Sequence, residues 1–168
     1  MAIPVRLSTW RLLTGAIVGV ERCCQALMEE REPQHGADPE SLWQLHVEGA
    51  LGESAYFQFR GASKLPTVGV YKGEHDAGKA EVRTRSRHDW ELIVRQRDPI
   101  DAFYVLVTGS YGDYLIHGYI SGEEARQDQW VKTHGGRSPA WFVPQSALTP
   151  FPEDPDPGHI YQPGEAAQ

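Results

Sequence analysis

Residues 73–87 read GEHDAGKAEVRTRSR, a stretch that begins with acidic residues and ends with basic ones. Asp76 stands five residues before Glu81, and Arg83 follows Glu81 by two positions. Two carboxylates and a cation at this spacing can hold a divalent metal ion beside a phosphate, because Mg²⁺ prefers hard oxygen ligands and keeps several of its waters. Asp76 beside a glycine is equally typical of a turn, followed by the solvated face of an ordinary strand. These residues by themselves leave both interpretations open.

The arginines that follow Glu81 extend this pattern. Alternate residues of a strand share a face, so Glu81, Arg83, Arg85 and Arg87 are expected to point the same way. A row of guanidinium groups beside a carboxylate is unusual in a core and typical of a surface that contacts phosphates. The residues expected to bind substrate are Arg85, Arg87, Lys79 and His75.

A third carboxylate stands on a predicted helix before this strand. Glu53 lies within GALGESA, where small residues flank it, and small residues allow another element to approach closely. Glu48 lies about 140° further around the helix, so Glu48 and Glu53 cannot face the same point. The candidate ligands for Mg²⁺ or Mn²⁺ are therefore Glu53, Asp76 and Glu81.

The elements that must position these residues follow from the hydrophobic periodicity. Residues 9–31 and 40–60 repeat apolar side chains at three- and four-residue spacing, which predicts two helices. After Gly61 the period changes to two, which predicts strands. The later predicted elements are strands over 66–73, 79–87, 91–97, 102–109 and 113–120, a helix over 122–130 and an edge strand over 141–145. This order predicts an α/β or α+β domain with helices packed on a central sheet.

Length and charge set limits on the class of protein. A chain of 168 residues with 40% hydrophobic residues usually forms one domain. We place it in residues 1–150, and we expect residues 151–168, rich in proline and acid, to form a flexible tail. The formal net charge of −7 excludes a protein that coats nucleic acid through bulk charge, so such binding needs a local basic patch.

Cysteine usage and the N-terminal segment predict a cytoplasmic protein. Cys23 and Cys24 are neighbours, which rarely bridge each other, so we expect a reducing compartment. The N-terminal segment shows no charged leader, apolar run and cleavage site of an export signal. The most apolar stretch, residues 12–20, is too short to span a bilayer. We therefore expect no association with a membrane.

Four motifs together resemble the PD-(D/E)XK, or restriction-endonuclease-like, superfamily, and they resemble in particular a group of small uncharacterised proteins encoded by phages and prophages. The motifs are HVEGALGE (46–53), DAGKAEVRT (76–84), LIVRQRD (92–98) and WFVPQSAL (141–148). This resemblance implies a central mixed sheet flanked by helices. It further implies a metal-dependent nuclease that cleaves phosphodiesters of nucleic acid, DNA in particular, in the host cytoplasm if the chain is phage-encoded.

The resemblance also implies roles for individual residues. Glu53 matches the helix carboxylate of the superfamily, and Asp76 and Glu81 match its two strand ligands. Arg83 occupies the position of the motif lysine, and His75 stands where the superfamily usually has proline.

Arginine at position 83 changes the expected chemistry. A lysine can orient or activate the attacking water, whereas arginine stays protonated and cannot act as a base. Arg83 can still stabilise charge that develops in the transition state, and Lys79 or Lys72 can replace the missing lysine. The alternative is a catalytically inactive domain of the same fold that binds nucleic acid or a protein partner.

Overall fold

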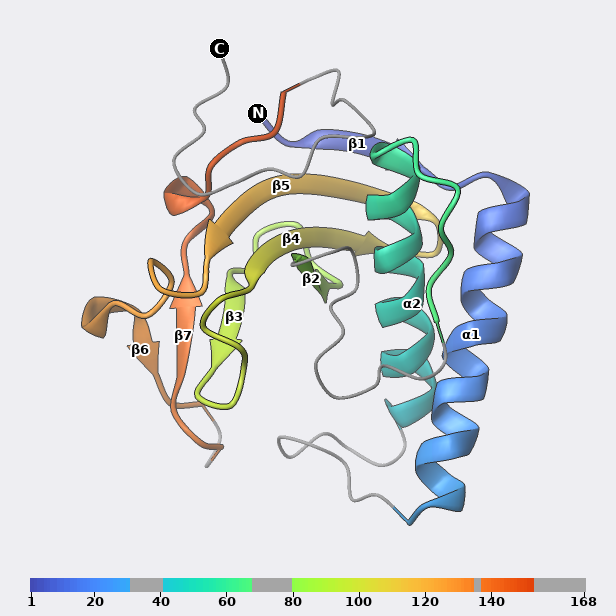
Figure 1. Ribbon diagram of the computed structural model, residues 1–168, viewed down its shortest axis with the longest axis horizontal. Helices are drawn as coiled ribbons and strands as arrows, with labels where there is room; N and C mark the ends of the chain where they lie inside the picture. The colour runs from blue at the N-terminus through green and yellow to red at the C-terminus, as the bar shows by residue number, and fades with distance from the viewer. Residues whose placement is uncertain (31–40, 68–79, 135–136, 153–168) are drawn as a thin grey trace.

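Two helices and two sheets are arranged in layers in the computed structural model, which describes residues 1–30, 41–67, 80–134 and 137–152. The helices cover one face of a four-stranded sheet, and a three-stranded sheet packs on the other side (Figure 1). The sequence prediction of an α+β domain is confirmed.

Helix α1 spans Thr9–Met28 and helix α2 spans Leu42–Phe59, which confirms both predicted helices. Ser8 caps α1, because its hydroxyl accepts a hydrogen bond from the Arg11 amide at 3.3 Å. The two helices approach so closely that a Cβ atom on Gly19 would lie 2.4 Å from the Cα atom of Val47. The lack of a side chain at Gly19 therefore allows α1 and α2 to pack at short distance.

The larger sheet contains β1 (Ile3–Arg6), β2 (Ala80–Arg85), β4 (Phe103–Ser110) and β5 (Asp113–Ser121). Its order is β1-β5-β4-β2, with β2 parallel to β4 and the other pairs antiparallel. The strands predicted over 79–87, 102–109 and 113–120 are confirmed, and β1 was not predicted. The first seven residues of β4 are buried, as in a strand covered on both faces.

The smaller sheet contains β3 (Leu92–Arg95), β6 (Val131–Lys132) and β7 (Ala140–Val143), in the order β3-β7-β6. The strand predicted over 141–145 is confirmed as β7, but its predicted position at the sheet edge is wrong, since β7 lies between β3 and β6. Pro144 follows the last residue of β7, so its missing amide proton removes no hydrogen bond from the ladder.

The helix predicted over residues 122–130 is also wrong. Ser121 and Glu124 form a capping box, with the Glu124 carboxylate accepting from the Ser121 hydroxyl at 2.7 Å and the Ser121 hydroxyl oxygen accepting from the Glu124 amide at 3.1 Å. After this turn the chain is extended at Gln127, and a 3-10 helix, η3 (Asp128–Trp130), follows. Arg126 donates at 2.6 Å to the Asp98 carbonyl, so a tertiary contact replaces the second helical turn.

The packed region extends to Phe151, which sequence analysis assigned to the tail. Its ring is 6% exposed and lies 4.9 Å from the ring centroid of Tyr119 and 5.3 Å from that of Phe59. Most of the strand predicted over 66–73, and residues 153–168 of the predicted tail, lie outside the described residues.

Candidate functional site

Glu53 is a buried acid on the helical side of the larger sheet. It is 7% exposed, in a part of α2 that is buried all round from Ala50 to Phe57. Arg22 of α1 donates to both carboxylate oxygens, at 2.6 and 2.8 Å, and its Nε donates to the Thr67 carbonyl at 2.8 Å. Glu53 is thus held by a two-pronged ion pair within the helical layer.

Strand β2 turns its two faces to different layers. Val82 belongs to the core shared with α2, and a Cβ atom on Gly52 of α2 would collide with Thr84. Arg83 lies on the other face, over the Tyr104 ring at 5.1 Å from its centroid. The predicted alternation therefore holds within β2, and it separates the arginines from the helical core.

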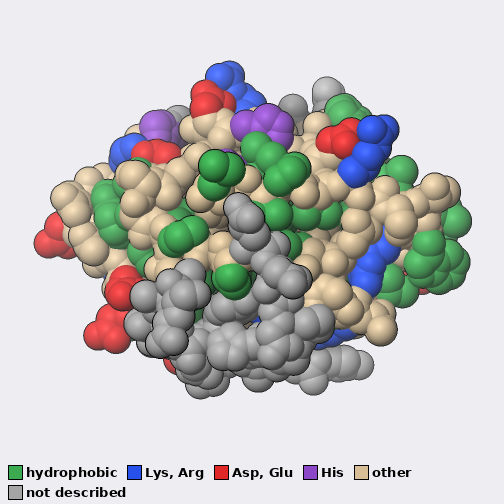
Figure 2. Space-filling model, turned by 90° about the horizontal axis from the view of Figure 1, so that it is seen from above, with side chains coloured by type: hydrophobic (Ala, Val, Ile, Leu, Met, Phe, Trp, Pro, Cys, Tyr) green, Lys and Arg blue, Asp and Glu red, His purple; other side chains and the backbone are tan. Residues whose placement is uncertain are grey.

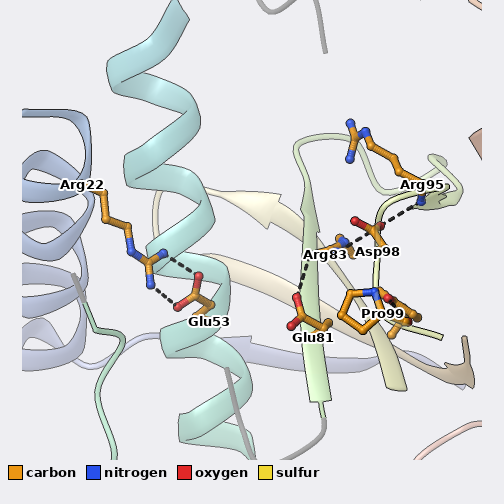
Figure 3. A network of polar contacts seen from close by, with 8 residues as sticks. Arg22, Glu53, Glu81, Arg83, Arg95, Asp98 and Pro99 are labelled. Atoms are coloured by element: carbon orange, nitrogen blue, oxygen red, sulfur yellow. Dashed lines mark hydrogen bonds and ion pairs between the residues drawn. The ribbon is translucent and has the colours of Figure 1, made fainter. Parts of the chain in front are cut away.

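Arg83 bridges two carboxylates on this second face. Its guanidinium lies 3.1 Å from Glu81 Oε2 and 3.1 Å from Asp98 Oδ2 (Figure 3). Burial lowers the pKa of Arg83, but Asp98 and then Glu81 outweigh that effect, and the net shift in pKa is upward. Arg83 stays charged, so it holds Glu81 and Asp98 together by charge and cannot serve as a base.

Asp98 is a central residue that sequence analysis did not nominate. Its side chain accepts from the Arg95 backbone amide at 2.8 Å. The next residue, Pro99, accepts from the Tyr104 hydroxyl at 2.6 Å. Burial, followed by the Asp98 charge, raises the pKa of Tyr104 to about 12. The available signal was the final residue of the LIVRQRD motif.

Arg85 carries the basic face further along β2. Its guanidinium lies 4.5 Å from the centroid of the Trp90 ring, and its buried Nε has no hydrogen-bond partner among the described residues. Burial and the neighbouring Arg95 lower the pKa of Arg85, with a weaker contribution from Arg137. Arg85 therefore sits among positive charges that the described residues offset only in part.

Arg95 of β3 faces the same region from the smaller sheet. Its side chain extends away from Asp98 in Figure 3. Burial lowers the pKa of Arg95, and although Asp98 opposes this, the positive charges of Arg83 and Arg137 lower it further. We call the group formed by Arg85, Arg95 and Arg137 the arginine cluster. Among the described residues, Glu91 raises the pKa of Arg85, and Lys132 forms an ion pair with Glu91 at 2.7 Å.

A pair of histidines borders the arginine cluster. Thr108, which pairs with Arg85 in the sheet register, has its hydroxyl 2.9 Å from His88 Nδ1 and 2.7 Å from His117 Nε2. One hydroxyl carries one proton, so it can donate to one ring and must accept from the other. Burial and then the charge of His88 lower the pKa of His117.

The predicted ligands are brought together only in part. Glu53 and Glu81 each turn to a different arginine (Figure 3). Asp76, His75, Lys79 and Lys72 lie outside the described residues. Within the residues that are described, no group of three acidic, histidine or cysteine side chains could hold a metal ion.

Arg87 differs from its prediction. Strand β2 ends at Arg85, so Arg87 is not part of the alternating row. It forms a surface ion pair with Asp89 at 2.9 Å and lies 5.8 Å from the centroid of the Trp90 ring. Hydrogen bonding to Asp89 raises the pKa of Arg87.

Comparison of the chain with protein-family models, curated proteins and solved structures finds no match. Within the described ranges, neither helix has the length and apolar character needed to cross a membrane.

Proposed function

We propose that the protein binds nucleic acid through the arginine cluster and Trp90. The observation that carries this proposal is the gathering of Arg85 and Arg95, from two different sheets, into one partly buried positive region. Like charges held together in a folded protein destabilise it. A bound polyanion would remove this repulsion, and guanidinium groups match phosphate oxygens in geometry and charge.

Trp90 favours nucleic acid over a small phosphate compound. Trp90 is 38% exposed, and its ring lies beside both Arg85 and Arg87. Aromatic rings next to a basic groove are typical of proteins on which the bases of a single strand stack. The local positive region also meets the requirement set by the formal net charge of −7, which rules out attraction by the molecule as a whole.

The test is fluorescence anisotropy with labelled single-stranded and duplex DNA of equal length, over a series of salt concentrations. Arg85→Gln should weaken binding about tenfold and reduce the log–log salt slope by about one unit. The matched control is Arg6→Gln, because Arg6 lies on the edge strand β1 and its side chain is 85% exposed. Equal affinities of the wild type and Arg85→Gln would reject the arginine cluster as the binding site.

A second candidate function is a metal-dependent phosphodiesterase, favoured by two acids of low exposure, which lie on opposite sides of the larger sheet. Glu53 lies on α2 and Glu81 on β2, and their oxygen atoms suit Mg²⁺ or Mn²⁺. Such an ion supplies an activated water and stabilises charge on the phosphoryl group. Both oxygens of Glu53 accept from Arg22, so this acid fits a metal only if Arg22 is displaced or shares it.

Calorimetry with Mn²⁺ and a DNA cleavage assay decide between the two candidates. The phosphodiesterase requires metal binding that is lost in Asp76→Ala, and cleavage that is lost in Glu81→Ala. DNA binding without metal uptake and without cleavage supports the binding module.

A further inference from the structure

Helix α1 has two apolar faces of different kinds. The face packed on α2 consists of the small buried residues Gly15, Gly19, Cys23 and Ala26. The large apolar residues that reveal the helix in the sequence lie mainly on its outer face. An exposed helix face is normally polar, so this outer face needs a separate explanation.

The outer face follows a regular repeat. Trp10, Leu13, Ile17, Val20 and Leu27 keep 41% to 64% of their surface exposed, and Cys24 is exposed as well. The spacing of these positions alternates between three and four along the whole helix, which is the a/d repeat of a two-stranded coiled coil. We call these six residues the α1 seam. Hydrophobic side chains gather at the end of the molecule where α1 lies (Figures 1 and 2).

The α1 seam is large enough for a stable interface. With Met28, which is 84% exposed, it presents roughly 500–900 Å² of surface, at about 150–250 Å² for a fully exposed large side chain. The largest apolar patch of a typical monomer covers about 300–600 Å². A standard protein interface takes about 800 Å² from each partner, and the outer face of α1 reaches that size.

We propose that the α1 seam pairs with the α1 seam of a second copy of this chain. A two-fold axis places the same patch on both sides of an interface, so the patch must complement itself. The seam does so in either helix direction. In the antiparallel direction Trp10 faces Leu27 and Leu13 faces Cys24, and in the parallel direction each residue faces its own copy. This dimer does not depend on nucleic-acid binding, because the seam lies on the opposite side of α2 from the arginine cluster.

The test is sedimentation velocity of the full chain over a range of concentrations. The wild type should sediment at twice the chain mass of 18.8 kDa. Ile17→Lys should sediment as a monomer, because a charge enters the centre of the seam. Ile100→Lys is the matched control, since Ile100 is 60% exposed against 52% for Ile17, and it should remain dimeric. Circular dichroism checks that both variants keep their helices.

A monomeric wild type at every concentration overturns the proposal, and so does a dimeric Ile17→Lys. Disulfide trapping adds a second readout. Cys24 should cross-link to its own copy in a parallel pair, or to Leu13→Cys of the other chain in an antiparallel pair. A dimer that forms neither cross-link uses another surface, and that result also overturns the proposal.

Discussion

The two arginine sites on either side of the larger sheet differ in their charge balance. In the helical layer, Arg22 binds both carboxylate oxygens of Glu53, with side chains 14% and 9% exposed. On the opposite face, Arg83 is matched by Glu81 and Asp98, whereas Arg85 and Arg95 add positive charge that burial and mutual repulsion act against.

This difference separates a stabilising ion pair from the proposed binding site. A closed ion pair between two buried partners holds two elements in register, and removal of one partner leaves a buried charge. An excess of one charge in a partly buried region lowers the stability of the free protein. A ligand of opposite charge removes this repulsion when it binds. Substitutions in the helical layer should therefore lower stability. Substitutions of the unbalanced arginines on the opposite face should weaken DNA binding without lowering stability.

The largest effect is expected from Glu53→Ala. It removes both hydrogen bonds that the buried Arg22 donates to the Glu53 carboxylate, and we expect the free energy of unfolding to fall by about 3 kcal/mol. Urea denaturation measures this change. The double variant Arg22→Met/Glu53→Leu should regain most of the loss, since no charge stays buried. Asp89→Ala, which breaks an exposed pair, is the control and should leave the urea midpoint unchanged.

Arg83→Met should have the next largest effect on stability. Glu81 and Asp98 would lose their shared partner while their side chains remain 16% and 17% exposed. We expect a loss of about 2 kcal/mol in the free energy of unfolding. The salt slope of DNA binding should change less than in Arg85→Gln, because the Arg83 charge is already balanced. A stable Arg83→Met with a strongly reduced slope would show that Arg83 belongs to the binding site.

Arg95→Gln should change stability and binding in opposite directions. Removal of one like charge from the arginine cluster should raise the free energy of unfolding by about 0.5 kcal/mol, as relief of a like-charge contact does. The same variant should bind DNA several times more weakly, as anisotropy can measure. Loss of stability in Arg95→Gln would contradict the claim that its charge is unbalanced in the free protein.

The smallest effect is a pH dependence of stability from His117. Its pKa is lowered from 6.5 in the folded protein, so the unfolded chain takes up the proton first as the pH falls. The stabilisation is complete above pH 6.5 and is lost as the pH falls through the folded pKa. His117→Gln should flatten the slope of unfolding free energy between about pH 7 and 5. An unchanged slope would show that the pH dependence of stability comes from another titratable group.

The fold was more predictable than the contacts within it. Periodicity identified α1, α2 and four strands, because local spacing reflects one buried face. It could not show that the large residues of α1 would face outward, since Gly15 and Gly19 allow α2 to occupy the other face. The helix predicted over 122–130 does not form beyond its first turn. The capping box that starts this turn can be recognised from neighbouring residues, whereas the contact of Arg126 with Asp98 joins distant segments and cannot.

For the candidate site, the direction in which side chains face was predictable, whereas their ion-pair partners were not. Alternation placed Glu81, Arg83 and Arg85 on one face of β2. No local pattern could show that Glu53 would form an ion pair with Arg22, which lies 31 residues away in sequence. Nor could it show that Arg83 would form an ion pair with Asp98. Ion pairs between distant segments depend on tertiary packing, which a single sequence does not reveal.

The most direct test of the arginine cluster is the salt dependence of DNA binding by the double variant Arg85→Gln/Arg95→Gln. The log–log salt slope should fall by about two units relative to wild type, and the unfolding free energy should not decrease. Arg6→Gln should reproduce the wild-type slope. An unchanged slope in the double variant, or a wild type that binds no DNA at low salt, would contradict the account.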